Sequence, residues 1–498
     1  MSQAREKSGH QPIKSLKSLV FHTQCSGLVT VLSGGVLVFL IVSITLVLYS
    51  IFTSQPPRWF RCPGCPDPTQ NLIQTCEPPD PSYATTDISH IVFGISGSTK
   101  TWNHRRIYSQ LWWKHNKTRG FVWLESEPRP YTLWPEENSP NHRVSSDWKR
   151  FKYSSSRSAV RIARVILDSF RVGLPNVRWF VMGDDDTVFF VDNLVTVLSK
   201  YDDRQMYYIG GNSESVEQDV MHAFDMAFGG GGFAISYPLA AELSRIFDAC
   251  LNRYYNFYGS DQRVWACVKE LGVSLTREPG FHQIDIRGDP FGLLAAHPMA
   301  PLVSLHHLDH VEPMFPNQTQ YESVKTLMKA YQLDPARIMQ QSLCYNTWYK
   351  WSVSISWGYA VQIYPSLLTA MELEMPLQTF KTWRSFSNGP FTFNTRPVSP
   401  DPCEQPLRFH LDLIEDDGKN GTVSTYKRYI DDESMKKCKK RYYDRITAIR
   451  RIVVSAQKMD NQEWKKNPRR RCCEIKSLNS GTMKVKIRRC DYHESITP

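Results

Sequence analysis

The chain has 498 residues, which is long enough for two domains and a large hydrophobic core. Its apolar fraction is ordinary at 41%, and its formal net charge is +11. The positive excess is concentrated between Met435 and Arg471, where fourteen Lys or Arg stand against three Asp or Glu. A basic segment of this kind raises the question of a nucleic-acid partner. A lumenal location, which the next features predict, argues against nucleic acid. An anionic glycan, an acidic partner or the membrane surface fits this segment better, and a solvated basic face is the alternative.

The first feature in chain order is an apolar segment from Leu28 to Tyr49 that carries no charge. A helix needs about 20 such residues to cross a bilayer, whereas a cleaved secretory signal normally has an apolar core of only about 7–15 residues. We therefore expect a single transmembrane anchor at 27–52. The flank before it is the more basic one, which predicts a cytoplasmic tail at 1–26 and a C-terminal body in a lumen or outside the cell.

Glycosylation sequons and cysteines support this topology. The sequons begin at Asn116, Asn317 and Asn420, all beyond the anchor. Eleven of the twelve cysteines also follow it, where disulfides are permitted, and an odd number leaves at least one unpaired or bonded to a partner. The pair Cys62-x-x-Cys65 has no second pair at zinc-finger spacing, which favours disulfides over a zinc knuckle.

Regular structure is expected after a proline-rich, extended stem at 53–86. Apolar runs and helical periodicity then alternate along the chain. They predict strands at 90–95, 121–124, 179–184, 206–209 and 233–236, and helices at 103–115, 159–170, 191–198 and 240–249. Such alternation indicates βαβ units and a largely parallel sheet. Near-alternation of apolar residues from Thr347 to Tyr364 predicts that 336–498 is a β-rich module with disulfides among its late cysteines.

Three successive carboxylates, Asp184, Asp185 and Asp186, end the apolar run that starts at Trp179. Adjacent anions repel one another, which is costly at a strand end unless a cation shares the cluster. A hard divalent ion with phosphate oxygens in its shell would relieve that cost. The carboxyl ends of parallel strands are also where open α/β sheets bind nucleotides. A solvated acidic turn is the alternative.

A run of four glycines, Gly229 to Gly232, precedes the strand expected at 233–236. Such a run is either a flexible joint or a place where the backbone approaches another group closely. No Lys-Ser/Thr follows it, which argues against a phosphate-binding P-loop.

Taken in order, four motifs resemble lumenal glycosyltransferases of the Fringe and core-1 β-1,3-galactosyltransferase superfamily. They are Gly183-Asp-Asp-Asp-Thr187 with Asp192-Asn193-Leu194, the glycine run with Phe233, Tyr258-Gly-Ser-Asp261 with Ala266 to Val273, and His306-His307-Leu-Asp309. The overlap covers roughly 88–315, and the long β-rich tail is similar to the plant Fringe-like branch. The resemblance implies an α/β fold with a GT-A-like, Rossmann-type mixed sheet and flanking helices at 87–335.

The resemblance also implies an inverting transfer of a hexose (galactose, N-acetylglucosamine or glucose) from a UDP-sugar to a glycan or glycoprotein acceptor, with a β-1,3 linkage expected. Asp186 would bind Mn²⁺ or Mg²⁺ directly. Asp184 would join it at the metal or, like Asp185, contact the ribose or metal-bound water. Either His306 or His307 would complete the shell, and the imidazole favours Mn²⁺; a packed turn is the alternative for this pair.

The remaining site residues follow from the same resemblance. Asp261 would be the general base, although an Asp at this position could equally cap the helix that follows. The glycines Gly230, Gly231 and Gly232 would lie against the donor sugar. Arg105 and Arg106 could reach the diphosphate or be solvated surface.

The resemblance also places the chain in the Golgi membrane as a single-pass type II protein with a lumenal catalytic domain. It has no nucleic-acid partner, and a homodimer or an enzyme complex stays open. Two alternatives remain for the function. The first is a catalytically silent, membrane-anchored lectin or scaffold of the same fold. The second is a phosphatase or nuclease that uses the carboxylates on two metals.

Overall fold

The computed structural model describes residues 40–46, 48, 85–128, 138–153, 156–429, 438, 443–466 and 468–498. The chain divides into two compact units, 1–83 and 84–498. The tail expected at 1–26, most of the anchor at 27–52 and nearly all of the stem at 53–86 lie outside the described residues. Residues 40–46 are helical, and the described residues contain no helix with the length and apolarity that a bilayer crossing requires.

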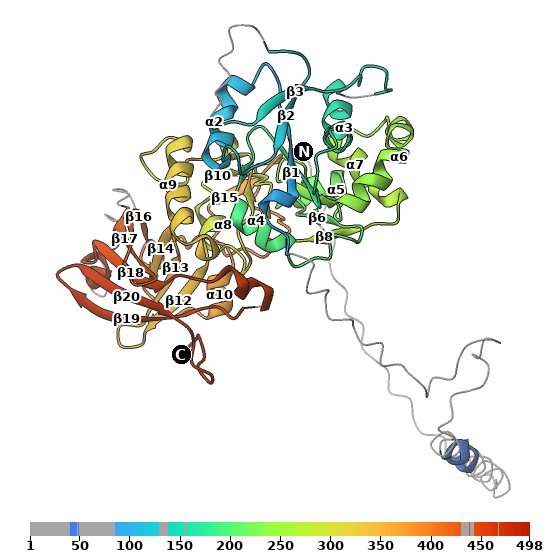
Figure 1. Cartoon of the computed structure of the whole chain (residues 1–498). Helices are drawn as coiled ribbons and strands as arrows, with labels where there is room; N and C mark the ends of the chain where they lie inside the picture. The colour runs from blue at the N-terminus through green and yellow to red at the C-terminus, as the bar shows by residue number, and fades with distance from the viewer. Residues whose placement is uncertain are drawn as a thin grey trace, which may run out of the picture. The chain divides into compact units, whose positions relative to one another are not determined.

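A mixed sheet lies at the centre of the α/β part of the second unit (Figure 1). Its strand order is β3-β2-β1-β4-β7-β6-β8. The strands are β1 (Ile91–Ser96), β2 (Gly120–Leu124), β3 (Asn141–Val144), β4 (Trp179–Asp184), β6 (Tyr208–Gly210), β7 (Phe233–Ser236) and β8 (Leu275–Arg277). Neighbouring strands are parallel except at β7, which runs antiparallel to β4 and β6. The expectation of a largely parallel sheet misses this reversal. The glycine run brings the chain into β7 beside the end of β4, where Phe233 pairs with Met182.

Helices cover both faces of the sheet, as the alternating side chains of β4 show. Phe180 and Met182 pack into one hydrophobic cluster with α3 (Arg157–Arg171), α6 (Tyr237–Arg253) and α7 (Ser260–Glu270). Trp179 and Val181 point to the other face and its cluster. That cluster includes α2 (Trp102–Trp112), α4 (Val191–Leu198) and α9 (Gln320–Leu333). The period-2 pattern of a strand buried on both faces explains the continuous apolar run of β4.

The described residues also form smaller helices and sheets. They are the helices α5 (Val216–Met221), α8 (Phe291–Ala295), α10 (Ala370–Glu374) and α12 (Tyr443–Thr447), a sheet of β5 (Val188–Phe189), β11 (Ser304–Leu305) and β9 (Phe281–His282), and the pair β10 (Ile286–Gly288) with β15 (Phe380–Thr382). Because β15 pairs with β10, chain beyond residue 336 returns to the α/β part. The boundary expected at 335/336 stays a prediction.

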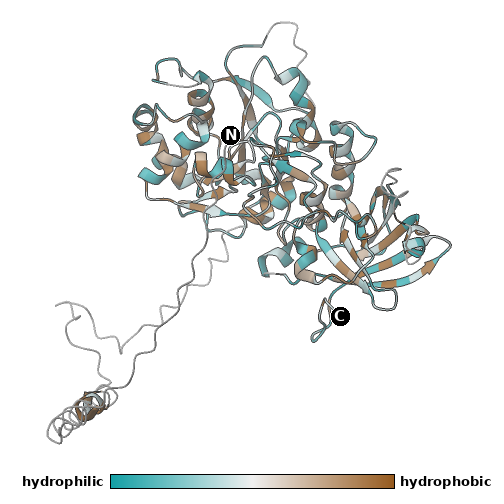
Figure 2. Ribbon diagram, turned by 180° about the vertical axis from the view of Figure 1, so that it is seen from behind, coloured by the Kyte–Doolittle hydropathy of each residue, from teal (hydrophilic) through white to brown (hydrophobic). Residues whose placement is uncertain are grey.

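The expected β-rich module contains a closed barrel. Its strands are β12 (Gln341–Asn346), β13 (Trp351–Ser356), β14 (Ala360–Tyr364), β16 (Leu407–Asp416), β17 (Gly421–Arg428), β18 (Arg451–Gln457), β20 (Thr482–Arg488) and β19 (Cys472–Asn479). Buried and more exposed residues alternate along β18 and β20, and hydrophilic and hydrophobic residues are mixed along the ribbon of this part (Figure 2). The alternation is typical of strands with one face inside a barrel.

Disulfides tie the barrel strands and two helices of the α/β part. The pairs are Cys250–Cys267, Cys344–Cys473, Cys403–Cys438 and Cys472–Cys490. The eight cysteines that the structure describes are therefore all paired. This confirms the expectation of disulfides among the late cysteines, whereas Cys62 and Cys65 lie outside the described residues.

Candidate metal centre

The acidic triplet stands where β4 ends beside β1. Asp184 pairs in register with Ser96, and the backbone N–H of Asp185 donates to the Ser96 carbonyl at 3.1 Å. Thr187 closes the turn, because its Oγ1 accepts from the Asp184 N–H at 2.8 Å and donates to the Gly230 carbonyl at 2.7 Å. One threonine thus connects the triplet to the glycine run.

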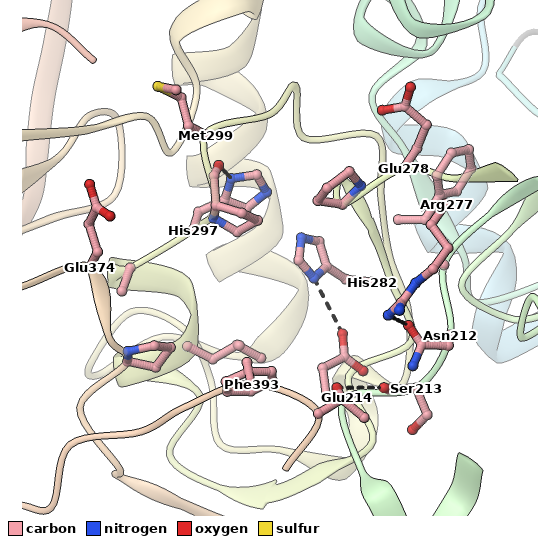
Figure 3. A pocket seen from close by; sticks show the side chains of 18 of the residues that line it. Asn212, Ser213, Glu214, Arg277, Glu278, His282, His297, Met299, Glu374 and Phe393 are labelled. Carbon is pink, nitrogen blue, oxygen red and sulfur yellow. Dashed lines mark hydrogen bonds and ion pairs between the residues drawn. The ribbon is translucent and has the colours of Figure 1, made fainter. Parts of the chain in front are cut away.

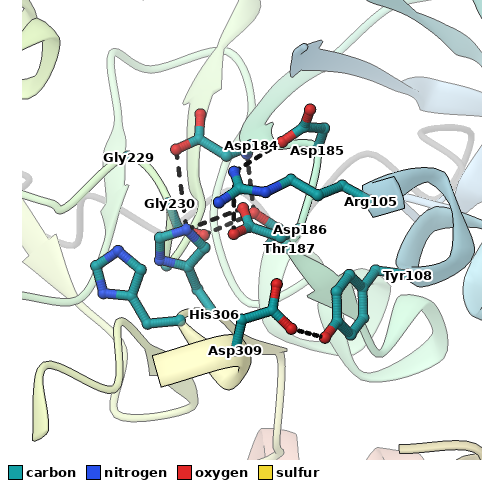
Figure 4. A network of polar contacts seen from close by, with 12 residues as sticks. Arg105, Tyr108, Asp184, Asp185, Asp186, Thr187, Gly229, Gly230, His306 and Asp309 are labelled. Atoms are coloured by element: carbon teal, nitrogen blue, oxygen red, sulfur yellow. Dashed lines mark hydrogen bonds and ion pairs between the residues drawn. The ribbon is translucent and has the colours of Figure 1, made fainter. Parts of the chain in front are cut away.

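The structure brings Asp184, Asp186 and His306 together (Figure 4). One ligand atom from each lies within 4.8 Å of the others. The Nε2 atom of His306 is 3.2 Å from Asp186 Oδ1 and 3.9 Å from Asp184 Oδ2. Atoms that share one divalent ion at bond lengths of about 2.0–2.6 Å lie within about 4–5 Å of one another. Asp186 Oδ1 is also buried, and apart from its ion pair with His306 it has no hydrogen bond within the described residues. Two carboxylates and an imidazole at this spacing fit a divalent cation, and the imidazole suits Mn²⁺.

Burial and charge act in opposite directions on these groups. Burial raises the pKa of Asp184 to about 7 and raises that of Asp185 as well. Burial also acts to raise the pKa of Asp186, but His306 and Arg105 outweigh it and hold that pKa below its usual value. Burial lowers the pKa of His306, yet the charge of Asp186 outweighs it and raises the pKa to about 9. Asp186 and His306 therefore form a buried ion pair, whose charge compensation a divalent cation on the same atoms would take over.

A side chain on α2 neutralises the other carboxylate of the triplet. Arg105 Nη1 lies 3.1 Å from Asp185 Oδ1 and 3.2 Å from Asp186 Oδ2. Thr101 Oγ1 donates to Asp185 Oδ2 at 2.9 Å, so both oxygens of Asp185 are engaged by this end of α2. The alternative of a solvated Arg105 is therefore wrong. The hydroxyl of Tyr108, also on α2, donates a hydrogen bond to Asp309. No sequence motif marks this contact.

The two adjacent histidines face different partners. His307 has a left-handed backbone (φ 54), and its Nδ1 lies 2.9 Å from Asp285 Oδ1. Its ring stacks on Trp383 at a centroid distance of 4.5 Å and an interplanar angle of 5°. Burial, with the neighbouring His306, lowers the pKa of His307 to about 4. The structure thus brings His306 to the carboxylates and does not bring His307 there, because the left-handed backbone directs that ring to Asp285.

Asp261 lies in the first turn of α7 beside the glycine run. Its Oδ2 accepts from the Gly229 N–H at 3.0 Å, and its Oδ1 accepts from Ser260 Oγ at 2.7 Å. The residue that caps α7 is Gly259, with no side-chain cap bond, so the helix-cap alternative for Asp261 is wrong. Asp261, Asp184 and Gly229 line the same small cavity of about 20 Å³. The expected base and the acidic triplet are therefore neighbours.

The glycines of the run lie close to other parts of the chain. This agrees with the close-approach interpretation of the run and not with a flexible joint. A Cβ on Gly230 would lie 2.0 Å from His306 Cε1. The Gly231 N–H donates to Gln283 Oε1 at 2.5 Å. Gly232 has φ +84, and a Cβ there would lie 2.8 Å from the Phe189 ring. These contacts explain why glycine is needed at Gly230 and Gly232; contact of the run with a donor sugar stays a prediction.

Two comparisons with known proteins indicate the family of the chain. Residues 218–473, about half of the chain, match a family described as "Protein of unknown function, DUF604". The chain is also similar to a β-1,3-glucosyltransferase of Mus musculus, with 29% identity over 139 residues. That match covers 28% of this chain and 27% of the relative, so the chain spans about a quarter of the relative's length. The two matches support a glycosyltransferase-like chain, but neither supports the plant Fringe-like branch. On the extent of the family match, the chain belongs to the DUF604 family.

Proposed function

We propose that this protein is an inverting, metal-dependent glycosyltransferase with a GT-A-like catalytic domain. It would move a hexose from a UDP-sugar to a glycan or glycoprotein acceptor. The observation that carries the proposal is the cluster of Asp184, Asp186 and His306 within 4.8 Å, at the end of a sheet strand and next to Asp261. The partial similarity to a β-1,3-glucosyltransferase favours glucose and a β-1,3 linkage over galactose or N-acetylglucosamine.

Asp184, Asp186 and His306 would hold Mn²⁺ or Mg²⁺, which supplies charge neutralisation to the leaving diphosphate when it is bound. The protein adds a cation of its own. Arg105 is anchored on Asp185 and Asp186 and its side chain is one-third exposed, so it can also contact a diphosphate. Asp185 acts indirectly, since Arg105 and Thr101 occupy its oxygens.

Asp261 would take the proton of the acceptor hydroxyl as that oxygen attacks the anomeric carbon from the face opposite UDP. The donors Gly229 N–H and Ser260 Oγ hold its carboxylate in one orientation. A base that is held in this way needs little reorganisation when the acceptor binds.

UDP release, measured with Mn²⁺ and an acceptor across a panel of UDP-sugars, tests the proposal. Asp186→Asn should lower kcat/KM by about 10²–10³-fold, because it removes charge from the metal shell. Asp261→Asn should lower kcat by about 10²–10⁴-fold and leave Mn²⁺ affinity unchanged. Asp225→Asn is the matched control, since Asp225 is exposed and pairs with Lys269 outside the cluster.

If the wild type and Asp186→Asn release UDP at the same background rate, the enzymatic proposal is wrong. The alternative of a catalytically silent lectin or scaffold then remains. Cleavage of a phosphoester without any acceptor sugar would favour the phosphatase or nuclease.

We further propose a single-pass type II location in the Golgi membrane with a lumenal catalytic domain. The paired cysteines fit an oxidising compartment. The sequon residues Asn116, Asn317 and Asn420 are all exposed and therefore accessible for glycosylation. Endoglycosidase treatment should increase the mobility of the wild type and leave a triple Asn→Gln variant unchanged. A homodimer or an enzyme complex stays a prediction.

A further inference from the structure

A second cavity, of about 530 Å³, opens near the ends of β6 and β8, and no residue of the acidic cluster lines it. Asn212 follows β6 and Arg277 ends β8, while Glu374 and Phe393 come from the chain beyond α9. Figure 3 shows the lining residues His282 and Glu214 near the centre of the view, with His297 and Met299 to one side. Its volume lies within the range of about 300–1,000 Å³ that small-molecule sites occupy.

Two buried histidines in this cavity each have one nitrogen without a partner. His282 is 6% exposed and His297 is 2% exposed. The Nδ1 atom of His282 lies 3.3 Å from Glu214 Oε1, and that of His297 lies 2.7 Å from the Pro298 carbonyl. Their Nε2 atoms are buried and have no hydrogen-bond partner within the described part of the chain. Buried polar atoms are nearly always paired, so these two indicate a ligand.

The hydrogen bond at Nδ1 of His297 fixes the position of its ring proton. A carbonyl oxygen can only accept, so Nδ1 of His297 carries the proton. A neutral imidazole then offers its Nε2 as an acceptor. Burial and the neighbouring His282 lower the pKa of His297 well below its ordinary value, which keeps that ring neutral. His297 therefore presents an acceptor nitrogen, which requires a ligand with a hydrogen-bond donor.

The rest of the lining narrows the ligand class. Phe281, Leu293 and Phe393 supply apolar wall. The two charged groups on the sheet side are already engaged, since Arg277 donates to Asn212 and Glu278 pairs with Lys200. Arg470 also lines the cavity, but Glu374 and the Gln341 carbonyl engage its guanidinium. With Glu214 buried in the lining as well, an anion is disfavoured. A saccharide has hydroxyl donors on its edges and apolar C–H faces, and it matches this combination of walls and acceptors.

The cavity and the metal centre share structural elements. The backbone of Gly211, which lines the cavity, accepts from the Phe228 N–H at 3.1 Å, immediately before the glycine run. On β9, His282 pairs in register with Leu305, which immediately precedes His306. A molecule held in the cavity is thus bound to the same framework that positions the acidic cluster.

We propose that this cavity binds a neutral saccharide, with Nε2 of His297 accepting a hydrogen bond from one of its hydroxyl groups and the unpartnered Nε2 of His282 as a second polar contact. Its use as the binding place of the sugar acceptor rests on the proposed function, whereas saccharide binding itself does not. The site includes Glu374 and Phe393 from the C-terminal part, so that part contributes directly to the choice of acceptor.

Saturation-transfer NMR and calorimetry on the full-length chain test this proposal without turnover. The probes are cellotriose, laminaritriose, maltotriose and the anionic trigalacturonate. We expect at least one neutral trisaccharide to bind and trigalacturonate not to bind. His297→Phe removes one acceptor and should weaken binding by about tenfold.

Because a buried histidine variant could fail to fold, Met299→Trp is the second test. Met299 is 43% exposed and lines the cavity, so a larger ring there should fill the space without disturbing the core. The matched control is Met206→Trp, because Met206 is 42% exposed and does not line the cavity. Binding that is weakened by Met299→Trp and unchanged by Met206→Trp supports the proposal.

The proposal is overturned if no neutral trisaccharide binds, if Met299→Trp binds as the wild type does, or if trigalacturonate binds better. The Asp186→Asn variant separates it from the proposed function, because that variant should lose UDP release and keep saccharide binding. If the protein binds a saccharide but never releases UDP, this inference stands and the proposed transferase function is wrong.

Discussion

The mixed sheet and the C-terminal barrel bury their polar groups in different ways. At the edge of the sheet, Asp185, Asp186 and His306 are each at most 3% exposed, and Arg105 lies against the carboxylates. On the barrel strands no buried residue is charged, and a disulfide joins β12 to β19 across 129 residues of sequence. Buried charges are costly and need a partner, whereas a covalent link stabilises without one. The difference assigns the chemistry to the sheet edge and much of the stability to the barrel.

Removal of the disulfide between β12 and β19 should have the largest effect on stability. The Cys344→Ser/Cys473→Ser variant loses the link between the strands that close the barrel, across 129 residues of sequence. The free energy of unfolding should fall by about 2–4 kcal/mol, measured by urea denaturation. Mn²⁺ affinity should stay at the wild-type value. An unchanged free energy of unfolding, or a loss of Mn²⁺ affinity in the same variant, would contradict the separation of stability and metal binding between the barrel and the sheet edge.

The Gly230→Ala substitution should act only on the sheet edge. Its Cβ would lie 2.0 Å from His306 Cε1, so the imidazole must move away from the carboxylates. We expect Mn²⁺ affinity to fall by about 10–100-fold, as measured by calorimetry, because the orientation of a ligand is lost. Gly259→Ala is the control, since a Cβ there meets nothing closer than 3.8 Å. Equal Mn²⁺ affinities in the two variants would contradict the assigned role of His306.

The smallest effect is expected at α9, which packs between the two regions. Its Tyr331 ring contacts Phe190 at 5.1 Å, and Ala330 lies close to Gly358 in the β13–β14 turn. Thr319 and Glu322 form a capping box at its start. Thr319→Ala should lower the free energy of unfolding by about 1 kcal/mol and leave Mn²⁺ affinity unchanged. It also removes the Asn317 sequon, so an Asn317→Gln variant is needed as the reference.

Local patterns of the sequence predict much of the α/β fold. The apolar run before the triplet predicts β4, and helical periodicity predicts a helix at 159–170, which the structure shows as α3 at Arg157–Arg171. Closure of the barrel was not predictable in this way, because Leu343 on β12 meets Cys472 on β19 across a long stretch of chain. The antiparallel β7 was missed for the same reason, since the direction of a strand depends on its neighbours and not on its own residues.

The candidate site shows the same limit. Asp184 and Asp186 could be identified from their position after a strand, whereas the choice between His306 and His307 depends on a left-handed backbone that no motif marks. The second cavity could not be found from the sequence, because Glu214, His282 and His297 belong to separate segments and none lies in a motif.

The most direct test of the central claim is pulsed electron paramagnetic resonance of the Mn²⁺-loaded protein, which detects nitrogen nuclei bound to the ion. We predict coupling to one imidazole nitrogen in the wild type, its loss in His306→Gln and its retention in His307→Gln. A spectrum without nitrogen coupling, or a coupling that disappears only in His307→Gln, would contradict the proposal that Asp184, Asp186 and His306 bind the metal.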